Sequence, residues 1–200
     1  PMDQFEGENS VAIPLSEVEL GKNYALVIST NSGLWRYLIG DTVKFTNLAP
    51  YRIKITGRTK HFINVFGEEL VIENAEDALE IACDKTNSSV MDYTVAPIFM
   101  NKDQTGGHEW LIEFKKEPEN LEEFVMHLDQ ALKQVNSDYE AKRYMDMTIR
   151  LPKIHKAQKG LFYKWLKNKN KLGGQHKVPR LSNQRDYLEE LLELYQSEPG

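Results

Sequence analysis

Cysteine is nearly absent from this chain of 200 residues, which contains only Cys83. A single cysteine excludes an internal disulfide bond and any metal site built on several thiolates within the chain. Because Cys83 lies in an apolar pattern at helical spacing, we expect it to be a small buried side chain of a helix. With 40% hydrophobic residues, the chain has enough apolar surface for the core of one large domain or two small ones.

Long apolar runs are also absent. No stretch approaches the roughly 18 apolar residues of a membrane span, and no signal-peptide pattern opens the chain. We therefore expect a cytoplasmic protein with no membrane partner. The net charge of −5 gives no indication of nucleic acid. Because Pro1 precedes Met2 and the first residues read as the interior of a sequence, we also expect the chain to be a portion of a longer protein.

Several common catalytic motifs are missing as well. The chain has no glycine-lysine phosphate loop, no nucleophile elbow and no Ser-His-Asp order. Its five histidines show no spacing typical of a metal site, so we predict no metal ligand. The chain is not expected to complete a reaction alone.

Residues 1–60 are predicted to be β-rich. The apolar run at 24–30 is typical of a strand buried on both faces. Segments 35–39 and 43–47 flank Gly40-Asp41 as the two strands of a hairpin would. Residues 51–56 alternate between apolar and polar side chains, which indicates a half-buried strand. These strands, with no helix between them, predict part of a small β-barrel or sheet.

From residue 62 onward the pattern predicts a compact α+β domain with helices on a small sheet. A strand at 62–66 is followed by a helix that begins near Asn74 and buries alanine and leucine residues. An apolar stripe predicts a helix from 121 to 135, and Asn120 with Glu123 resembles its capping box. The remaining elements are expected as strands at 91–100, around 110–114 and at 147–151, with helices at 160–170 and near the end of the chain.

The Gly40-Asp41 and Gly57-Arg58 pairs are the main candidates for ligand binding. A carboxylate after a glycine at a strand end accepts hydrogen bonds from ribose hydroxyls, or it caps an ordinary turn. A guanidinium can bind a phosphate through two hydrogen bonds, or it remains an exposed loop cation. Together the two pairs predict half of a nucleotide site.

The segment 153–180 contains nine Lys or Arg residues and no Asp or Glu. It is either a solvated basic face, an electrostatic funnel for an anionic substrate, or a surface that contacts nucleic acid. Its aromatic residues have the spacing of an amphipathic helix, so nucleic acid is the minor alternative. Within it, Lys177 follows Gly173-Gly174, and a lysine on such a loop can stabilise developing negative charge. Lys60, where the β-rich pattern ends, is either a hinge position or a solvated lysine.

The stretch from Leu20 to Asp41, which ends in Tyr-Leu-Ile-Gly-Asp, resembles the auxin-responsive acyl acid-amido synthetases in a bacterial version. The resemblance continues at Gly57-Arg58 and in the Gln-His-Lys-Val-Pro-Arg sequence at 175–180. It covers the C-terminal portion of a family member. The family belongs to the acyl-adenylate-forming superfamily, which also contains acyl-CoA ligases.

The resemblance implies roles for individual residues. Tyr37 and Asp41 belong to a nucleotide motif in which Asp41 holds the ribose hydroxyls. Arg58 also faces the nucleotide, and Lys60 occupies the hinge position. Lys177 is implied to be the catalytic lysine that bridges the acyl carboxylate and the α-phosphate.

The implied reaction has two half-reactions. A carboxylic acid attacks Mg-ATP and releases pyrophosphate, and an amino acid amine then attacks the acyl-adenylate and releases AMP. Residues 1–57 would end a large domain, 58–60 would be the hinge, and 61–200 would form a small mobile domain. The Mg²⁺ ligand and an N-terminal domain of the same protein are expected outside this chain, and the chain alone is expected to be inactive. Two alternatives stay open, an acyl-CoA-type ligase and a non-catalytic binding module with a basic face.

Overall fold

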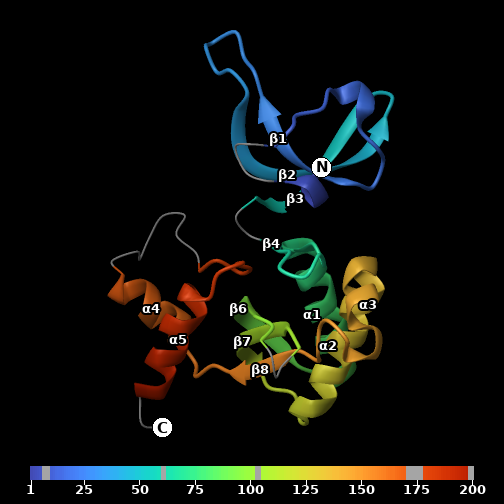
Figure 1. The fold of residues 1–200 in the computed structure, drawn as a ribbon. Helices are drawn as coiled ribbons and strands as arrows, with labels where there is room; N and C mark the ends of the chain where they lie inside the picture. The colour runs from blue at the N-terminus through green and yellow to red at the C-terminus, as the bar shows by residue number, and fades with distance from the viewer. Residues whose placement is uncertain (6–9, 60–61, 102–104, 170–177, 198–200) are drawn as a thin grey trace. The chain divides into compact units, whose positions relative to one another are not determined.

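The computed structural model describes residues 1–5, 10–59, 62–101, 105–169 and 178–197. The chain divides into two compact units, Pro1–Phe62 and Ile63–Gly200, here called unit one and unit two (Figure 1). The fold is mixed α and β, as expected.

Unit one is built on an antiparallel sheet in the order β1-β2-β3. The strands are β1 (Asn23–Ile28), β2 (Tyr37–Leu48) and β3 (Tyr51–Arg58). In the described residues before them lie the 3-10 turns η1 (Met2–Gln4) and η3 (Leu15–Glu17). The sheet is open and does not close into a barrel within the described residues. Of the two predicted forms, the small sheet is therefore the one observed.

Burial in unit one differs from the expectation. Strand β1 is not buried on both faces, since Val27 is 39% exposed. The apolar side of β3 also faces outward, and Ile55 is 66% exposed, whereas Thr56 is buried. The reason is that the core of unit one is small: Tyr24, Val43 and Phe45 pack with side chains from residues 13–26 on one side of the sheet.

The predicted hairpin around Gly40-Asp41 is wrong. Strand β2 runs without interruption from Tyr37 to Leu48 and contains both residues. Gly40 has a φ of +90°, a conformation that glycine adopts without a steric penalty, and the β2–β3 register shifts between Thr42 and Val43. The glycine therefore makes a bend inside one strand, and the connection to β3 lies at residues 49–50.

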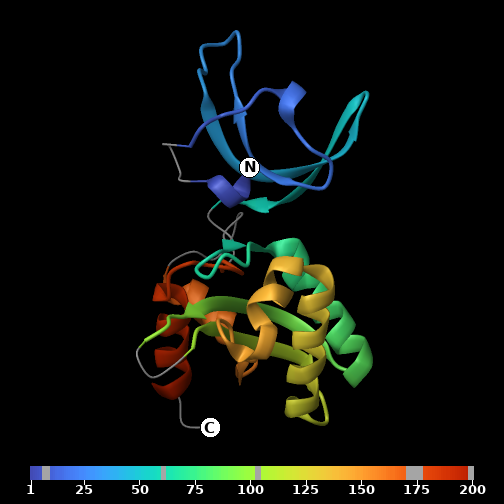
Figure 2. The same cartoon turned by 45° about the vertical axis from the view of Figure 1, so that its right-hand side comes forward.

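Unit two has a sheet between two layers of helices (Figures 1 and 2). The sheet has the order β6-β7-β8, with β6 (Ser89–Ile98) antiparallel and β8 (Lys153–Lys156) parallel to β7 (Gly107–Lys116). One face packs on α1 (Ile72–Thr86) and α2 (Leu121–Val135). The other face packs on α4 (Leu161–Asn168) and α5 (Asp186–Ser197). Residues 107–114 of β7 are consequently buried on both faces.

The helix pair α1 and α2 follows the sequence pattern. Phe124, Leu128 and Leu132 of α2 are fully buried, as predicted, and they pack in one core with the alanine-rich face of α1. Asn120 caps α2, because its Oδ1 accepts hydrogen bonds from the amides of Glu122 (2.9 Å) and Glu123 (3.3 Å). Asn74 does not cap α1 as expected. The helix begins earlier, and Asn74 accepts from the amide of Val71 (3.3 Å) within the first turn.

Other strand predictions need correction. The predicted strand at 147–151 shortens to a single parallel bridge between Ile149 and Gly106, in which the Gly106 amide donates to Thr148 O (3.0 Å) and the Arg150 amide donates to Gly106 O (2.9 Å). On its other edge the amide of Ile149 donates to Lys142 O (3.1 Å) and its carbonyl accepts from Arg143 (3.0 Å). Both groups are thus used by the end of α3 (Ser137–Arg143), which a turn of 3-10 helix, η4 (Tyr144–Asp146), follows. The predicted strand at 62–66 shortens to β4 (Phe62–Ile63), which pairs with β5 (Leu70–Val71). Cys83 lies in α1 but is only partly buried.

Candidate functional site

Asp41 and Arg58 are register partners on β2 and β3, and Thr42 lies opposite Gly57 beside them. Directly opposed residues of an antiparallel pair have Cα atoms about 4.5–5.5 Å apart. The structure thus places opposite one another the two residues that the sequence analysis assigned to one nucleotide site. Tyr37 lies at the start of β2, opposite Ile28 of β1, and is 52% exposed.

The backbone around Asp41 is held by the bend at Gly40. The carbonyl of Gly40 accepts hydrogen bonds from the amide (2.8 Å) and the hydroxyl (3.4 Å) of Thr59. A Cβ atom at Gly40 would come no closer than 3.9 Å to another atom, so the positive φ rather than space requires glycine there. The end of β3 is therefore fixed to the bend that precedes Asp41.

A buried polar cluster lies beside this strand pair. The Thr56 hydroxyl donates to Asn23 Oδ1 (2.6 Å), and its oxygen lies 3.0 Å from Thr42 Oγ1. All three residues are buried, and they come from β3, β1 and β2. The sequence analysis missed this cluster. Its signal was the presence of Thr42 and Thr56, rather than apolar residues, in two neighbouring strands.

Two further predicted site residues, Lys60 and Lys177, lie outside the described residues. The described part of the basic segment 153–180 is largely matched by acids from other elements. Four of its cations form ion pairs: Lys153 with Glu109, Lys156 with Glu117, Lys169 with Glu190, and Arg180 with Glu76. This pairing reduces the local positive charge and so gives no support to a nucleic-acid surface.

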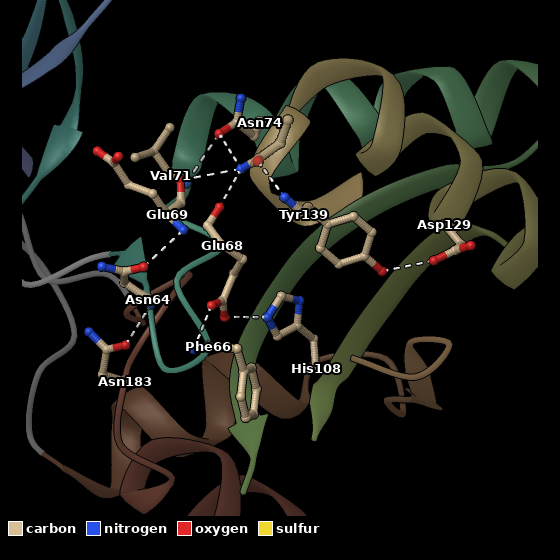
Figure 3. A network of polar contacts seen from close by, with 11 residues as sticks. Asn64, Phe66, Glu68, Glu69, Val71, Asn74, His108, Asp129, Tyr139 and Asn183 are labelled. Atoms are coloured by element: carbon tan, nitrogen blue, oxygen red, sulfur yellow. Dashed lines mark hydrogen bonds and ion pairs between the residues drawn. The ribbon is translucent and has the colours of Figure 1, made fainter. Parts of the chain in front are cut away.

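Unit two contains a buried carboxylate–imidazole pair that the sequence did not reveal. Glu68 and His108 are fully buried, and His108 Nε2 lies 2.8 Å from Glu68 Oε1 (Figure 3). The other oxygen, Oε2, accepts from the amide of Phe66 at 2.7 Å. Burial acts to raise the pKa of Glu68, but the bonds from His108 and from the backbone outweigh it, so the pKa is lowered.

The tautomer of His108 follows from its surroundings. Its Nδ1 is buried and has no hydrogen-bond partner among the residues that the structure describes, whereas Nε2 faces the Glu68 carboxylate. The arrangement fits a proton on Nε2 that is donated to Glu68, because a proton on Nδ1 would be buried without an acceptor. The ring stacks on Tyr139 at 5.6 Å, and the Tyr139 hydroxyl donates to Asp129 (2.9 Å). The position of His108 in a strand of mostly apolar residues indicated a buried histidine. Its partner Glu68 lies 40 residues earlier in the chain and could not be identified from the sequence.

No group of three or more His, Cys, Asp or Glu side chains that could hold a metal ion occurs in the part of the chain that the structure describes. Among the same residues, no helix has the length and apolar character needed to cross a membrane.

Comparison with known proteins decides the family. The family model described as "GH3 family central domain" matches residues 1–58, and "GH3 family C-terminal domain" matches residues 73–186, more than half of the chain. The chain belongs to the GH3 family. The family resemblance seen in the sequence is therefore confirmed, whereas the bacterial origin stays a prediction.

GH3 relatives include the indole-3-acetic acid-amido synthetase GH3.3 of Arabidopsis thaliana, which is 27% identical over 194 residues. This alignment covers 90% of the chain and 32% of the relative. The jasmonoyl-L-amino acid synthetase GH3.5 of Oryza sativa subsp. japonica is 29% identical over 202 residues, or 89% of the chain and 33% of the relative. The chain thus spans about a third of the length of these GH3 proteins.

A solved structure of the same family supports the fold. The GH3.15 acyl acid amido synthetase superposes with a TM-score of 0.67 at 22% sequence identity. The superposition covers 94% of this chain and 35% of that one. The α+β arrangement described above is accordingly the GH3 fold of this region.

Proposed function

We propose that this GH3 chain is the C-terminal portion of an ATP-dependent acyl acid-amido synthetase. Residues 1–57 end its large domain, 58–60 form the hinge, and 61–200 form the small mobile domain. Support comes from the division of the structure after Phe62 and from the separate family models for the central and C-terminal domains. The names of the relatives, which are amido synthetases for indole-3-acetic acid and for jasmonate, support the reaction class.

The reaction proceeds in two steps. A carboxylate oxygen of the acid attacks the α-phosphorus of ATP, and the bond from that phosphorus to pyrophosphate breaks. The amino acid nitrogen then attacks the acyl carbon, the bond to AMP breaks, and the amine loses a proton. The substrates are a small carboxylic acid, an amino acid and ATP.

The observation that carries the proposal is the position of Asp41 directly opposite Arg58. In this arrangement Asp41 accepts hydrogen bonds from the ribose hydroxyls while Arg58 faces a phosphate or sugar oxygen of the same nucleotide. Tyr37, on the same strand as Asp41, completes the nucleotide-binding set. Lys177 is proposed as the catalytic lysine on the strength of its sequence motif.

Magnesium accompanies ATP in this proposal, but the chain is not assigned a ligand for it. Asp41 is a single carboxylate, and the described residues provide no cluster of three metal-ligating side chains around it. Mg²⁺ supplies charge neutralisation of the phosphates when bound. The roles of Asp41 and Arg58 toward the ribose and the nucleotide do not depend on it.

The test is acid-dependent exchange of pyrophosphate into ATP, measured in a protein of full GH3 length that contains this chain. We expect Asp41→Asn and Arg58→Ala each to raise the KM for ATP about tenfold or more, as loss of a charged hydrogen bond does. Arg52→Ala is the matched control, because Arg52 lies on β3 opposite Asn47, away from Asp41. Exchange that requires no acid, or an equal effect of Arg52→Ala, would contradict the proposal.

Product analysis separates the remaining alternatives. Amino acids as acceptors give amides, whereas a thioester formed with coenzyme A would indicate an acyl-CoA-type ligase. Affinity for RNA or DNA that falls steeply with salt, without exchange activity, would instead indicate a binding module.

A further inference from the structure

The segment that follows Lys177 in the sequence, residues 178–182, lies along the free edge of β6 in unit two. The amide of Val95 donates to Arg180 O (2.8 Å), and the amide of Ser182 donates to Val95 O (3.1 Å). These two hydrogen bonds form a parallel bridge between Val95 and Leu181. The backbone of the segment is therefore attached to the sheet.

Side chains anchor the same segment near both of its ends. Thr94 Oγ1 donates to Pro179 O (2.7 Å), and Thr94 is buried. Val178 is buried in the core that α4 and α5 form with the sheet, whereas Leu181 is buried in the core on the side of α1 and α2. Because both cores are closely packed, the segment cannot shift without uncovering one of these apolar side chains.

Arg180 connects the segment 178–182 to α1. Its guanidinium forms an ion pair with Glu76 of α1, and its Cζ lies 5.1 Å from the centre of the Tyr93 ring. A charged hydrogen bond and a contact with a ring face together restrict both the position and the direction of a guanidinium. Arg180 is thus fixed between a helix and a strand, although the sequence analysis assigned no role to it.

The backbone next to Lys177 has little freedom of its own. Pro179 has a φ fixed by its ring, and a residue that precedes proline, here Val178, is restricted to extended conformations. Lys177 is bonded directly to Val178. Any displacement of the segment 178–182 is therefore passed on to Lys177 through the backbone.

We propose that Arg180, Glu76 and Thr94 are positioning residues, which fix the segment 178–182 and thereby set the position of Lys177 for the adenylation step. This inference rests on the proposed function, in which Lys177 is the catalytic lysine. That lysine must meet the acyl carboxylate and the α-phosphate together, and an error of about 1 Å in the position of a catalytic group costs up to about 100-fold in rate. The three residues produce this effect without contacting a substrate.

The first test removes the hydroxyl of Thr94 in a protein of full GH3 length that contains this chain. Thr94→Val cannot donate to Pro179 O, whereas Thr94→Ser keeps the donor. Thr86→Val is the matched control, because the Thr86 hydroxyl donates to the carbonyl of Ala82 (2.8 Å) within α1. We expect Thr94→Val to lower the kcat of acid-dependent pyrophosphate exchange about tenfold, with the KM for ATP nearly unchanged. Thr94→Ser and Thr86→Val should retain the unsubstituted rate.

The second test compares the two members of the ion pair, which are partly exposed and so also cover the case in which Thr94→Val fails to fold. Arg180→Met and Glu76→Met should lower pyrophosphate exchange to a similar extent and leave amide formation from a preformed acyl-adenylate nearly unchanged. Lys156→Met is the matched control, because Lys156 forms a partly exposed ion pair with Glu117. If Arg180 contacted ATP itself, Glu76→Met would free its charge and preserve or raise the exchange, and that result would overturn the inference.

The decisive comparison uses Lys177→Ala as the background. Residues that act only through Lys177 have no further effect once its amine is removed, so Arg180→Met should not lower the residual pyrophosphate exchange of Lys177→Ala. A loss as large as in the unsubstituted background would show that Arg180 acts by another route and would refute the inference.

Hydrogen exchange gives a readout that does not depend on activity. The amides of Val95 and Ser182 should exchange faster in Thr94→Val and Arg180→Met than in the Thr86→Val control, because the bonds of the segment open more often. Unchanged protection of these amides would contradict the inference, as would pyrophosphate exchange as fast in Thr94→Val as in Thr86→Val. If the unsubstituted protein shows no acid-dependent pyrophosphate exchange, the proposed function itself fails and the inference falls with it.

Discussion

Arg143 donates to both carboxylate oxygens of Asp129, from Nε at 2.5 Å and from Nη2 at 3.1 Å. Both residues are buried, and the pair connects α3 to α2. Burial acts to raise the pKa of Asp129, but the bonds from Arg143, Lys133 and Tyr139 lower it overall. The carboxylate is thus charged in the folded protein. Without it, the buried guanidinium of Arg143 would have no opposite charge and would destabilise the fold.

We predict that Asp129→Ala lowers the free energy of unfolding by about 3–5 kcal/mol, because it leaves a buried guanidinium without a counter-charge. Lys133→Ala provides the comparison, since Lys133 pairs with the same carboxylate at 2.7 Å from a more exposed position. Its loss should cost about 1 kcal/mol or less. Urea unfolding measures both values, and similar costs for the two variants would show that the buried position of Arg143 is unimportant.

Glu109 makes the stability of the folded protein depend on pH. Burial acts to raise its pKa, but hydrogen bonds from Lys153, His155 and Arg185 lower it from 4.5 to about 2. The folded state therefore binds this proton more weakly than the unfolded state. The contribution of Glu109 to the free energy of unfolding is therefore fully present above about pH 4.5 and is lost as the pH falls toward 2.

We therefore expect Glu109→Gln to destabilise the protein at neutral pH by about 1–3 kcal/mol, with the difference from the unsubstituted protein shrinking between pH 5 and pH 2. Chemical unfolding across that pH range is the measurement. A difference that stays constant with pH would mean that the charge of Glu109 contributes nothing and that only its shape matters.

Lys177 is predicted to act in the first half-reaction. Lys177→Ala should reduce acid-dependent pyrophosphate exchange about 100-fold or more, because it removes a cation from the developing negative charge. Amide formation from a preformed acyl-adenylate should be nearly unchanged. Lys167→Ala, at the end of α4 in the same basic segment, is the control. Exchange at the unsubstituted rate in Lys177→Ala would show that the assigned role is wrong.

Lys60 is predicted to be the hinge. Proline at this position restricts φ, so Lys60→Pro should leave pyrophosphate exchange intact and reduce amide formation, which needs the rotated arrangement. Lys60→Ala retains backbone freedom and should preserve both steps. If the proline variant loses the two steps to the same extent, rotation at this residue is not required.

Local patterns in the sequence predicted local structure well. The stripe of Phe124, Leu128 and Leu132 and the cap at Asn120 were readable because a helix is defined by residues within a few positions of one another. The same local reasoning failed at Gly40-Asp41, since a bend within a strand and a turn between strands need the same backbone freedom from glycine. Which one forms depends on pairing with β3, and that partner is distant in the sequence.

The candidate sites show the same limit. Asp41 and Arg58 were each recognisable as ligand-binding types, but their opposition follows from the register of β2 on β3. The Glu68–His108 pair joins a loop to the central strand of the sheet, and no spacing rule connects the two. The strand expected at 147–151 is reduced to one bridge with Gly106, a distant partner that the local pattern does not show, while α3 uses the hydrogen-bonding groups of Ile149.

The outer edge of β6 has one further consequence. At Val95 both backbone groups are already used, because its amide donates to Arg180 O (2.8 Å) and its carbonyl accepts from the amide of Ser182 (3.1 Å). Pro97, two residues on, has no N–H to offer. An unprotected strand edge is a template for another extended chain, and such templates promote aggregation. The short segment around Leu181 thus closes the middle of this edge against strand addition from a neighbouring molecule.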